Sequence, residues 1–128
     1  MARIVVIEDE DFTRLAVRHV LEGLGHEVFT ATNGIEGMEA FRRNLPDLVL
    51  TDIFMPERDG LEMVRELKRD HPTIKVICMS AGSRSDASSR ITSGTALDIA
   101  EMLGADASIA KPFTTTQLAT VLDAVLAA

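Results

Sequence analysis

The chain has 128 residues, of which 46% are hydrophobic, and its formal net charge is −7. This length and apolar content predict a single globular domain over residues 1–128, with no separate output domain, and exclude a disordered chain. The acidic balance disfavours direct nucleic-acid binding, and no apolar run approaches the roughly 20 residues that a membrane-spanning helix needs. No signal-peptide pattern follows the first residues, and Cys78 has no second cysteine to pair with, so we expect a cytoplasmic protein.

Five short apolar segments are bounded by polar or turn-forming residues, a pattern typical of strands. The segments are 3–7, 26–30, 48–52, 74–79 and 106–110. The third is apolar almost throughout and ends in one carboxylate, Asp52. Such a run is typical of a strand that is covered on both faces of a parallel sheet.

Helical spacing of apolar residues and N-cap signals predict five helices that alternate with these strands. The first helix starts at Phe12 and stops at Gly23, and the other four begin at the pairs Asn33–Glu36, Asp59–Glu62, Thr95–Asp98 and Thr114–Gln117. Before the fourth helix, the serine-rich stretch from Gly82 to Gly94 has no clear period and predicts a long loop. The alternation predicts an α/β fold: a doubly wound, five-stranded parallel sheet with right-handed crossovers and helices on both faces, in three αβα layers.

Polar side chains stand where four of the predicted strands end. They are Glu8 and Asp9 after the first strand, Asp52 at the end of the third, Ser80 after the fourth and Lys111 after the fifth. Because ligands bind outside the carboxyl ends of parallel strands, we expect these groups to share one rim of the sheet. Three neighbouring carboxylates repel each other, and a hard divalent cation with oxygen ligands removes the repulsion. The rim therefore predicts a Mg²⁺ site.

The same rim predicts phosphoryl transfer, which needs positioning and charge neutralisation more than covalent help from the protein. Asp52 is the candidate nucleophile, Lys111 and Mg²⁺ would neutralise the phosphoryl oxygens, and Ser80 could hydrogen-bond one of them. Taken alone, Glu8 and Asp9 are equally compatible with a solvated turn that caps the following helix.

With these motifs in order, the chain resembles a response-regulator receiver domain, the phosphoacceptor of a two-component system, of the stand-alone type. The resemblance rests on the acidic pair after the first strand, on Asp52-Ile53-Phe54-Met55-Pro56 with Asp59-Gly60, on Ser80-Ala81 and on Lys111-Pro112-Phe113. It implies a flavodoxin-like sheet in the strand order 2-1-3-4-5.

The resemblance also implies roles for the residues at the metal site. Asp52 would be the phosphorylation site and a metal ligand. Asp9 would bind Mg²⁺ directly, together with the main-chain carbonyl of Phe54, and Glu8 would act mostly through a coordinated water.

Two further groups would respond to the phosphoryl group. Lys111 would form a salt bridge with the carboxylate or the phosphoryl group, and its bond to Pro112 resembles one that is often cis in the family. Ser80 would swing toward the phosphoryl group and transmit the switch.

The family resemblance implies signalling and not turnover of an external substrate: the domain would catalyse only its own phosphorylation and dephosphorylation. A histidine kinase or a histidine phosphotransfer protein would supply the phosphoryl group, and the surface of the fourth and fifth helices and the fifth strand would bind a protein partner. No nucleic acid or membrane is an expected partner. Two departures from the family pattern bear on the output: Ser108 stands where an aromatic residue is usual, and the loop from Gly82 to Gly94 is longer than the family norm.

Three other functions compete with this interpretation. A Mg²⁺-dependent phosphohydrolase with an aspartyl-phosphate intermediate would share the chemistry of Asp52, but the sequence has neither Asp-x-Asp there nor a cap domain. A flavin-binding protein of the same strand order would need a phosphate site after the first strand, where the run from Glu8 to Asp11 would repel the phosphate. His19 could suggest a phosphohistidine carrier, although a histidine on a helix surface is the simpler interpretation.

Overall fold

The computed structural model describes residues 1–54, 60–81 and 93–128, and these residues form five strands that alternate with five helices. The strands are β1 (Arg3–Ile7), β2 (Glu27–Ala31), β3 (Leu48–Asp52), β4 (Lys75–Ala81) and β5 (Ala107–Lys111). The helices are α1 (Asp11–Gly23), α2 (Gly34–Asn44), α3 (Gly60–Asp70), α4 (Ser93–Met102) and α5 (Thr115–Ala127). All strand pairs are parallel, and the order in the sheet is β2-β1-β3-β4-β5. The predicted flavodoxin-like fold is confirmed.

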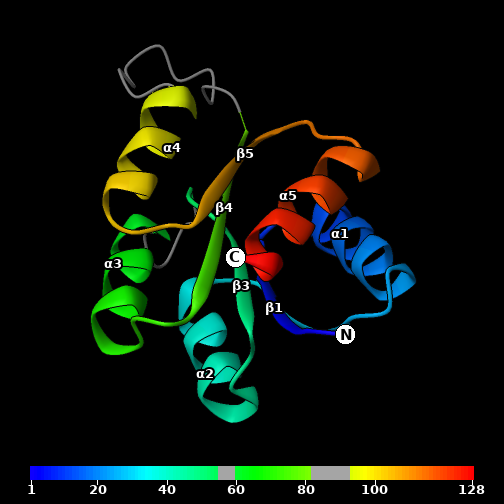
Figure 1. Ribbon diagram of the computed structural model, residues 1–128, viewed down its shortest axis with the longest axis horizontal. Helices are drawn as coiled ribbons and strands as arrows, with labels where there is room; N and C mark the ends of the chain where they lie inside the picture. The colour runs from blue at the N-terminus through cyan, green and yellow to red at the C-terminus, as the bar shows by residue number, and fades with distance from the viewer. Residues whose placement is uncertain (55–59, 82–92) are drawn as a thin grey trace.

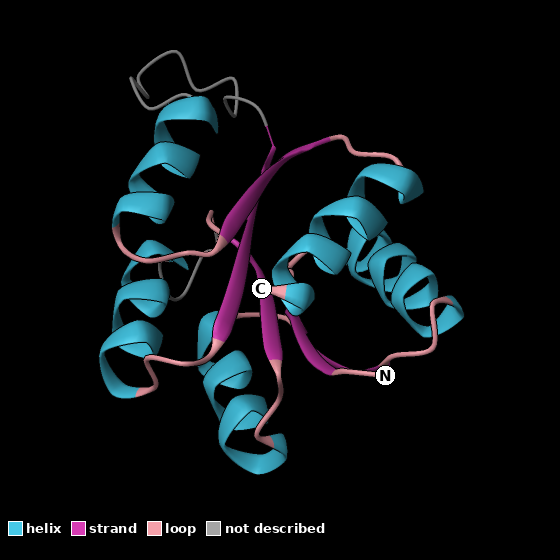
Figure 2. Cartoon of the chain, in the orientation of Figure 1, coloured by secondary structure: helices cyan, strands magenta, loops and turns pink. Residues whose placement is uncertain are grey.

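The helices cover the two faces of the sheet unequally, with α1 and α5 on one face and α2, α3 and α4 on the other (Figure 1). Successive residues of β1 separate accordingly: Ile4 and Val6 pack with α1 and α5, whereas Val5 and Ile7 pack with α2 and α3. This period of two on a strand with both faces buried explains why the sequence runs are apolar throughout. Figure 2 shows the resulting three layers, with the sheet between two sets of helices.

The starts of α2 and α5 follow the cap signals, whereas the predicted cap at Thr95 is wrong, because α4 already begins at Ser93. Asn33 accepts a hydrogen bond from the backbone of Glu36 at the start of α2, and Thr114 forms a full capping box with Gln117 at the start of α5. The predicted cap residue Asp59 lies outside the described residues, as do Met55 and Pro56.

The element boundaries differ from the predictions by one or two residues. Strand pairing moves β2, β4 and β5 toward the C-terminus, so that Lys111 ends β5 and does not follow it. The predicted loop up to Gly94 is wrong at its end, because α4 already begins at Ser93; residues 82–92 lie outside the described part of the chain. Serine and glycine carry no apolar period, and the first turn of this helix was therefore not visible in the sequence pattern.

The register of the sheet brings the polar strand ends together. Ile7 pairs with Thr51, Asp52 pairs with Met79, and Ala81 pairs with Lys111, so the carboxyl ends of β1, β3, β4 and β5 meet along one edge. None of the helices in the described ranges is long and apolar enough to cross a bilayer.

Candidate functional site

Three carboxylates converge at the carboxyl ends of β1 and β3. One oxygen from each of Glu8, Asp9 and Asp52 lies within 4.8 Å of the others. Glu8 and Asp52 are buried and Asp9 is half-buried, so solvent reaches the cluster mainly at Asp9. The predicted convergence of these residues is thus present in the structure.

Lys111 crosses from β5 and joins two of the carboxylates. Its ammonium donates to Oε1 of Glu8 at 2.7 Å and to Oδ2 of Asp52 at 2.8 Å. The Lys111 side chain is only 14% exposed, against 1% for Glu8 and 5% for Asp52. An ion pair this far from water is weakly screened, so its partners strongly influence each other's protonation.

The backbone around Asp52 fixes the other side of its carboxylate. The main-chain amide of Phe54 donates to Oδ1 of Asp52 at 3.0 Å, and the hydroxyl of Thr51 donates to the main-chain carbonyl of Asp52 at 2.9 Å. Both carboxylate oxygens of Asp52 therefore accept a hydrogen bond, one from Lys111 and one from the turn after β3.

Gly60 at the start of α3 packs directly against this turn. Its amide donates to the carbonyl of Ile53 at 3.0 Å, and a Cβ at this position would lie 2.4 Å from the carbonyl oxygen of Asp52 and 2.7 Å from Cα of Ile53. Only glycine permits this approach, because the atoms in the way are backbone and cannot move aside. The glycine of the Asp59-Gly60 motif is thus required for steric reasons.

The charges at the site are not balanced by protein groups alone. Burial, followed by the neighbouring Asp52 carboxylate, raises the pKa of Glu8 from 4.5 to about 8, although Lys111 opposes the shift. Burial by itself would lower the pKa of Lys111, but the hydrogen bonds and charges of Asp52 and Glu8 outweigh it, and the pKa of this ammonium is raised. Without a further cation, Glu8 therefore keeps a proton near neutral pH.

The donor set fits a hard divalent cation. In the described ranges no hydrogen-bond donor reaches the buried Oε2 of Glu8, so this oxygen is left for a cation, a bound water or a proton. Three carboxylates facing one ammonium leave excess negative charge, and clustered carboxylate oxygens suit Mg²⁺.

Two other predicted residues lie at the same edge of the sheet. Ser80 is fully buried near the end of β4, one residue beyond the position that pairs with Asp52, and lies opposite Ala110 of β5. Phe54 contributes its amide, which donates to Asp52. The role of its carbonyl as a metal ligand stays a prediction. The peptide bond from Lys111 to Pro112 is cis, as the resemblance implied.

One residue at the site was missed by the sequence analysis. Arg14 of α1 donates to the main-chain carbonyl of Glu8 at 3.0 Å and to Oδ1 of Asp11 at 2.5 Å. Its side chain is only 14% exposed, which is unusual for an arginine on a short surface helix. The available signal was an arginine one turn into the helix that follows the acidic pair.

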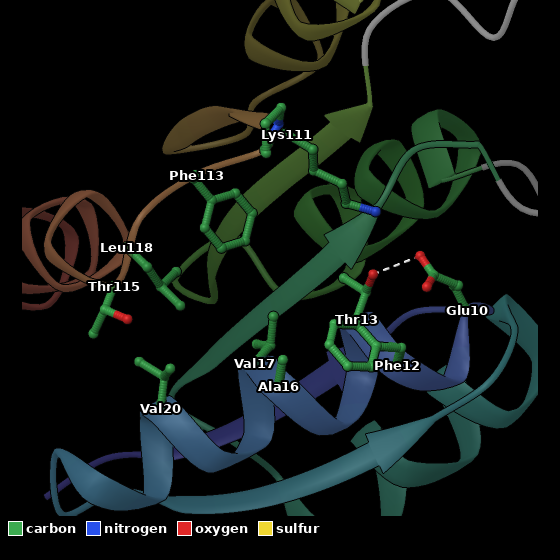
Figure 3. A pocket seen from close by; sticks show the side chains of 11 residues that line it. Glu10, Phe12, Thr13, Ala16, Val17, Val20, Lys111, Phe113, Thr115 and Leu118 are labelled. Carbon is green, nitrogen blue, oxygen red and sulfur yellow. Dashed lines mark hydrogen bonds between the residues drawn. The ribbon is translucent and has the colours of Figure 1, made fainter.

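A groove with a volume of about 570 Å³ runs between α1 and α5, beside the cluster. Figure 3 shows the ammonium of Lys111 pointing toward the end of the groove that holds Glu10 and Thr13, and away from Val20. Thr13 donates to Glu10 at 2.6 Å at this polar end. The rest of the lining is largely apolar and includes Phe12, which is 78% exposed.

Ser108 on β5 occupies the position where the resemblance implies an aromatic ring. Its hydroxyl donates to Oε1 of Glu101 at 2.8 Å, which links β5 to α4 by a polar contact. Gly82, where the predicted loop begins, lies outside the described residues.

Comparisons with known proteins agree with this geometry. The family profile described as "Response regulator receiver domain" matches residues 4–123. The chain belongs to the response-regulator receiver-domain family. Receiver domains are the signalling domains of two-component systems, so the family prediction is confirmed.

Several relatives of this receiver domain are much longer proteins. It is 35% identical to "Sensor kinase CckA" of Brucella abortus over 98% of this chain and 12% of that protein. It is 36% identical to "Transcriptional regulatory protein CseB" of Streptomyces avermitilis over 96% of this chain and 48% of that protein. The chain thus spans half or less of the length of these curated relatives. Among solved structures, a response regulator receiver domain protein from Clostridium thermocellum has a TM-score of 0.84 and 30% identity, covering 98% of this chain and 94% of that one.

Proposed function

We propose that this receiver domain accepts a phosphoryl group on Asp52 in a Mg²⁺-dependent reaction. The observation that carries the proposal is the convergence of Glu8, Asp9 and Asp52 within 4.8 Å, with the Lys111 ammonium bound to two of them. A solvated capping turn would not bury Glu8 and Asp52 together, because burying paired carboxylates is costly without a cation.

The phosphoryl donor in this proposal is a phosphohistidine of a histidine kinase or a phosphotransfer protein. A carboxylate oxygen of Asp52 attacks the phosphorus, the P–N bond to the imidazole breaks, and the imidazole leaves and takes up a proton. The amide of Phe54 and the ammonium of Lys111 hold the Asp52 carboxylate in one orientation, which supplies the positioning that phosphoryl transfer requires.

Mg²⁺, when bound, neutralises phosphoryl oxygens, and Glu8, Asp9, Asp52 and the carbonyl of Phe54 are the groups proposed to hold it. Lys111 is already placed between two carboxylates and can move one of its hydrogen bonds to a phosphoryl oxygen. The buried hydroxyl of Ser80 at the end of β4 is the group proposed to sense that oxygen. The response would reach a protein partner through the surface of α4, β5 and α5, where the Ser108–Glu101 hydrogen bond takes the place of an aromatic contact.

We further propose that residues 1–128 act as one phosphoacceptor domain, located in the cytoplasm and without enzymatic turnover of an external substrate. Neither nucleic acid nor membrane is a proposed partner.

The experiment that tests the proposal is incubation with acetyl phosphate and Mg²⁺, followed by intact-mass measurement. We expect one phosphoryl adduct on the wild-type chain and none on Asp52→Asn, which keeps the size of the side chain. Asp123→Asn removes an exposed carboxylate on α5 and serves as the matched control, with the adduct unchanged. An adduct that survives in Asp52→Asn, or that forms equally in EDTA, rejects the proposal.

A further inference from the structure

Arg14 contacts the backbone of the segment that carries the acidic pair. Its guanidinium makes two hydrogen bonds with different nitrogens, one to the carbonyl of Glu8 and one to the carboxylate of Asp11. Two fixed donors on a planar group hold both acceptors in one geometry, which a single ammonium cannot do.

The carbonyl that Arg14 holds belongs to the peptide unit between Glu8 and Asp9. Strand β1 ends at Ile7, so this peptide lies just beyond the ladder that would otherwise fix it. The amide of Glu8 still donates to the carbonyl of Ala31 in β2 at 3.0 Å. With Arg14 on the carbonyl side, the backbone of Glu8 is anchored at both ends, and the directions of the Glu8 and Asp9 side chains are set by that backbone.

Two opposite effects on a cation follow from this placement. The positive charge of Arg14 lies close to the carboxylate cluster and by itself repels a divalent cation. The hydrogen bond to Glu8 holds the acidic pair in position, and residues that orient metal ligands contribute about 10- to 100-fold to metal affinity. The positioning effect is therefore expected to exceed the repulsion from a guanidinium that is already paired with Asp11.

We propose that Arg14 is a positioning residue for the divalent-cation site, acting through the peptide unit that joins Glu8 and Asp9. The inference rests on the proposed Mg²⁺-dependent function and adds a residue that touches neither the cation nor the phosphoryl group. It gives the first turn of α1 a role in metal binding through geometry and not through charge.

The test is Mg²⁺ titration by calorimetry of the full chain and three variants, without a phosphoryl donor. Arg14→Met removes the charge and both hydrogen bonds, whereas Arg14→Lys keeps the charge and loses the two-point geometry. Arg18→Met removes the same charge one turn further along α1, where Arg18 pairs with exposed Glu22 at 2.9 Å. Far-UV circular dichroism and urea unfolding define conditions under which every variant is folded during the titration.

We expect Kd for Mg²⁺ to rise about tenfold in both Arg14 variants and to change less than about twofold in Arg18→Met. A purely electrostatic role gives the opposite pattern, with tighter binding in Arg14→Met and wild-type binding in Arg14→Lys, and that result overturns the inference. Equal affinity in all four proteins also overturns it while leaving the proposed function intact. A wild-type chain that binds no Mg²⁺ ends the proposed function itself, and this inference with it.

Discussion

The raised pKa of Glu8 predicts an unusual pH dependence of stability in the metal-free protein. Its pKa in the folded chain is about 8, above the ordinary 4.5, so the folded state keeps a proton that the unfolded state has released. The stabilisation linked to this proton is fully present below about pH 4.5 and is lost as the pH rises through about 8. Metal-free wild-type protein should therefore become less stable from pH 5 to pH 8.

The size of the effect follows from the shift. While the two states differ by one proton, the free energy of unfolding falls by at most about 1.4 kcal/mol per pH unit. Between pH 5.5 and 8 we expect a loss of at least about 2 kcal/mol from Glu8. Glu8→Gln, which is uncharged and keeps an acceptor for Lys111, should remove this contribution.

The assay is urea unfolding in EDTA at several pH values, followed by far-UV circular dichroism because the chain has no tryptophan or tyrosine. The difference in free energy of unfolding between wild type and Glu8→Gln isolates Glu8 from other titrating groups. We expect the free energy of unfolding of the variant to rise steadily relative to that of the wild type up to about pH 8. Parallel pH profiles of the two proteins would refute the reasoning, since they would mean that Glu8 ionises normally in the folded chain.

Three substitutions test other parts of the site and fold. Lys111→Met leaves Glu8 and Asp52 without their cation, so in EDTA we expect a loss of about 3 kcal/mol in urea unfolding, partly recovered by Mg²⁺. Gly60→Ala places a Cβ against the backbone of Asp52 and should cost about 2 kcal/mol and slow phosphorylation by acetyl phosphate, whereas Gly23→Ala, with nothing within 4 Å, should be neutral or slightly stabilising. Thr114→Ala removes the capping box of α5 and should lower the free energy of unfolding by about 1 kcal/mol. An unchanged stability in Lys111→Met, Gly60→Ala or Thr114→Ala would contradict the corresponding contact.

The strand ends were predictable from sequence because they combine two strong signals. A buried strand gives an apolar run, and a parallel sheet places the carboxyl ends of such runs at one edge. Asp52 and Lys111, 59 positions apart, could therefore be assigned to the same rim before any distance was known. The same logic brought Glu8 and Asp9 there.

The contacts behind the rim could not be predicted in this way. Arg14 binds a main-chain carbonyl, and every residue has one, so no pairing pattern in the sequence indicates it. The direct bond between Lys111 and Glu8 depends on how far each side chain extends beyond its strand, which the period of the strands does not specify. The steric need for Gly60 likewise becomes visible only when α3 is seen to start on the backbone of Asp52.

A proton and a divalent cation are alternative solutions to the same excess of negative charge at this site. Because Glu8 retains its proton up to about pH 8 in the metal-free protein, a cation that needs the ionised carboxylate must displace that proton. Affinity for Mg²⁺ should then rise with pH, by up to about tenfold per unit below pH 8, and level off above it. Calorimetry at pH 7 in two buffers of different ionisation enthalpy would measure the released proton, and Glu8→Gln should release none. Equal heats in the two buffers for the wild type would mean that cation and proton do not compete, and that the protonation of Glu8 is not coupled to cation binding.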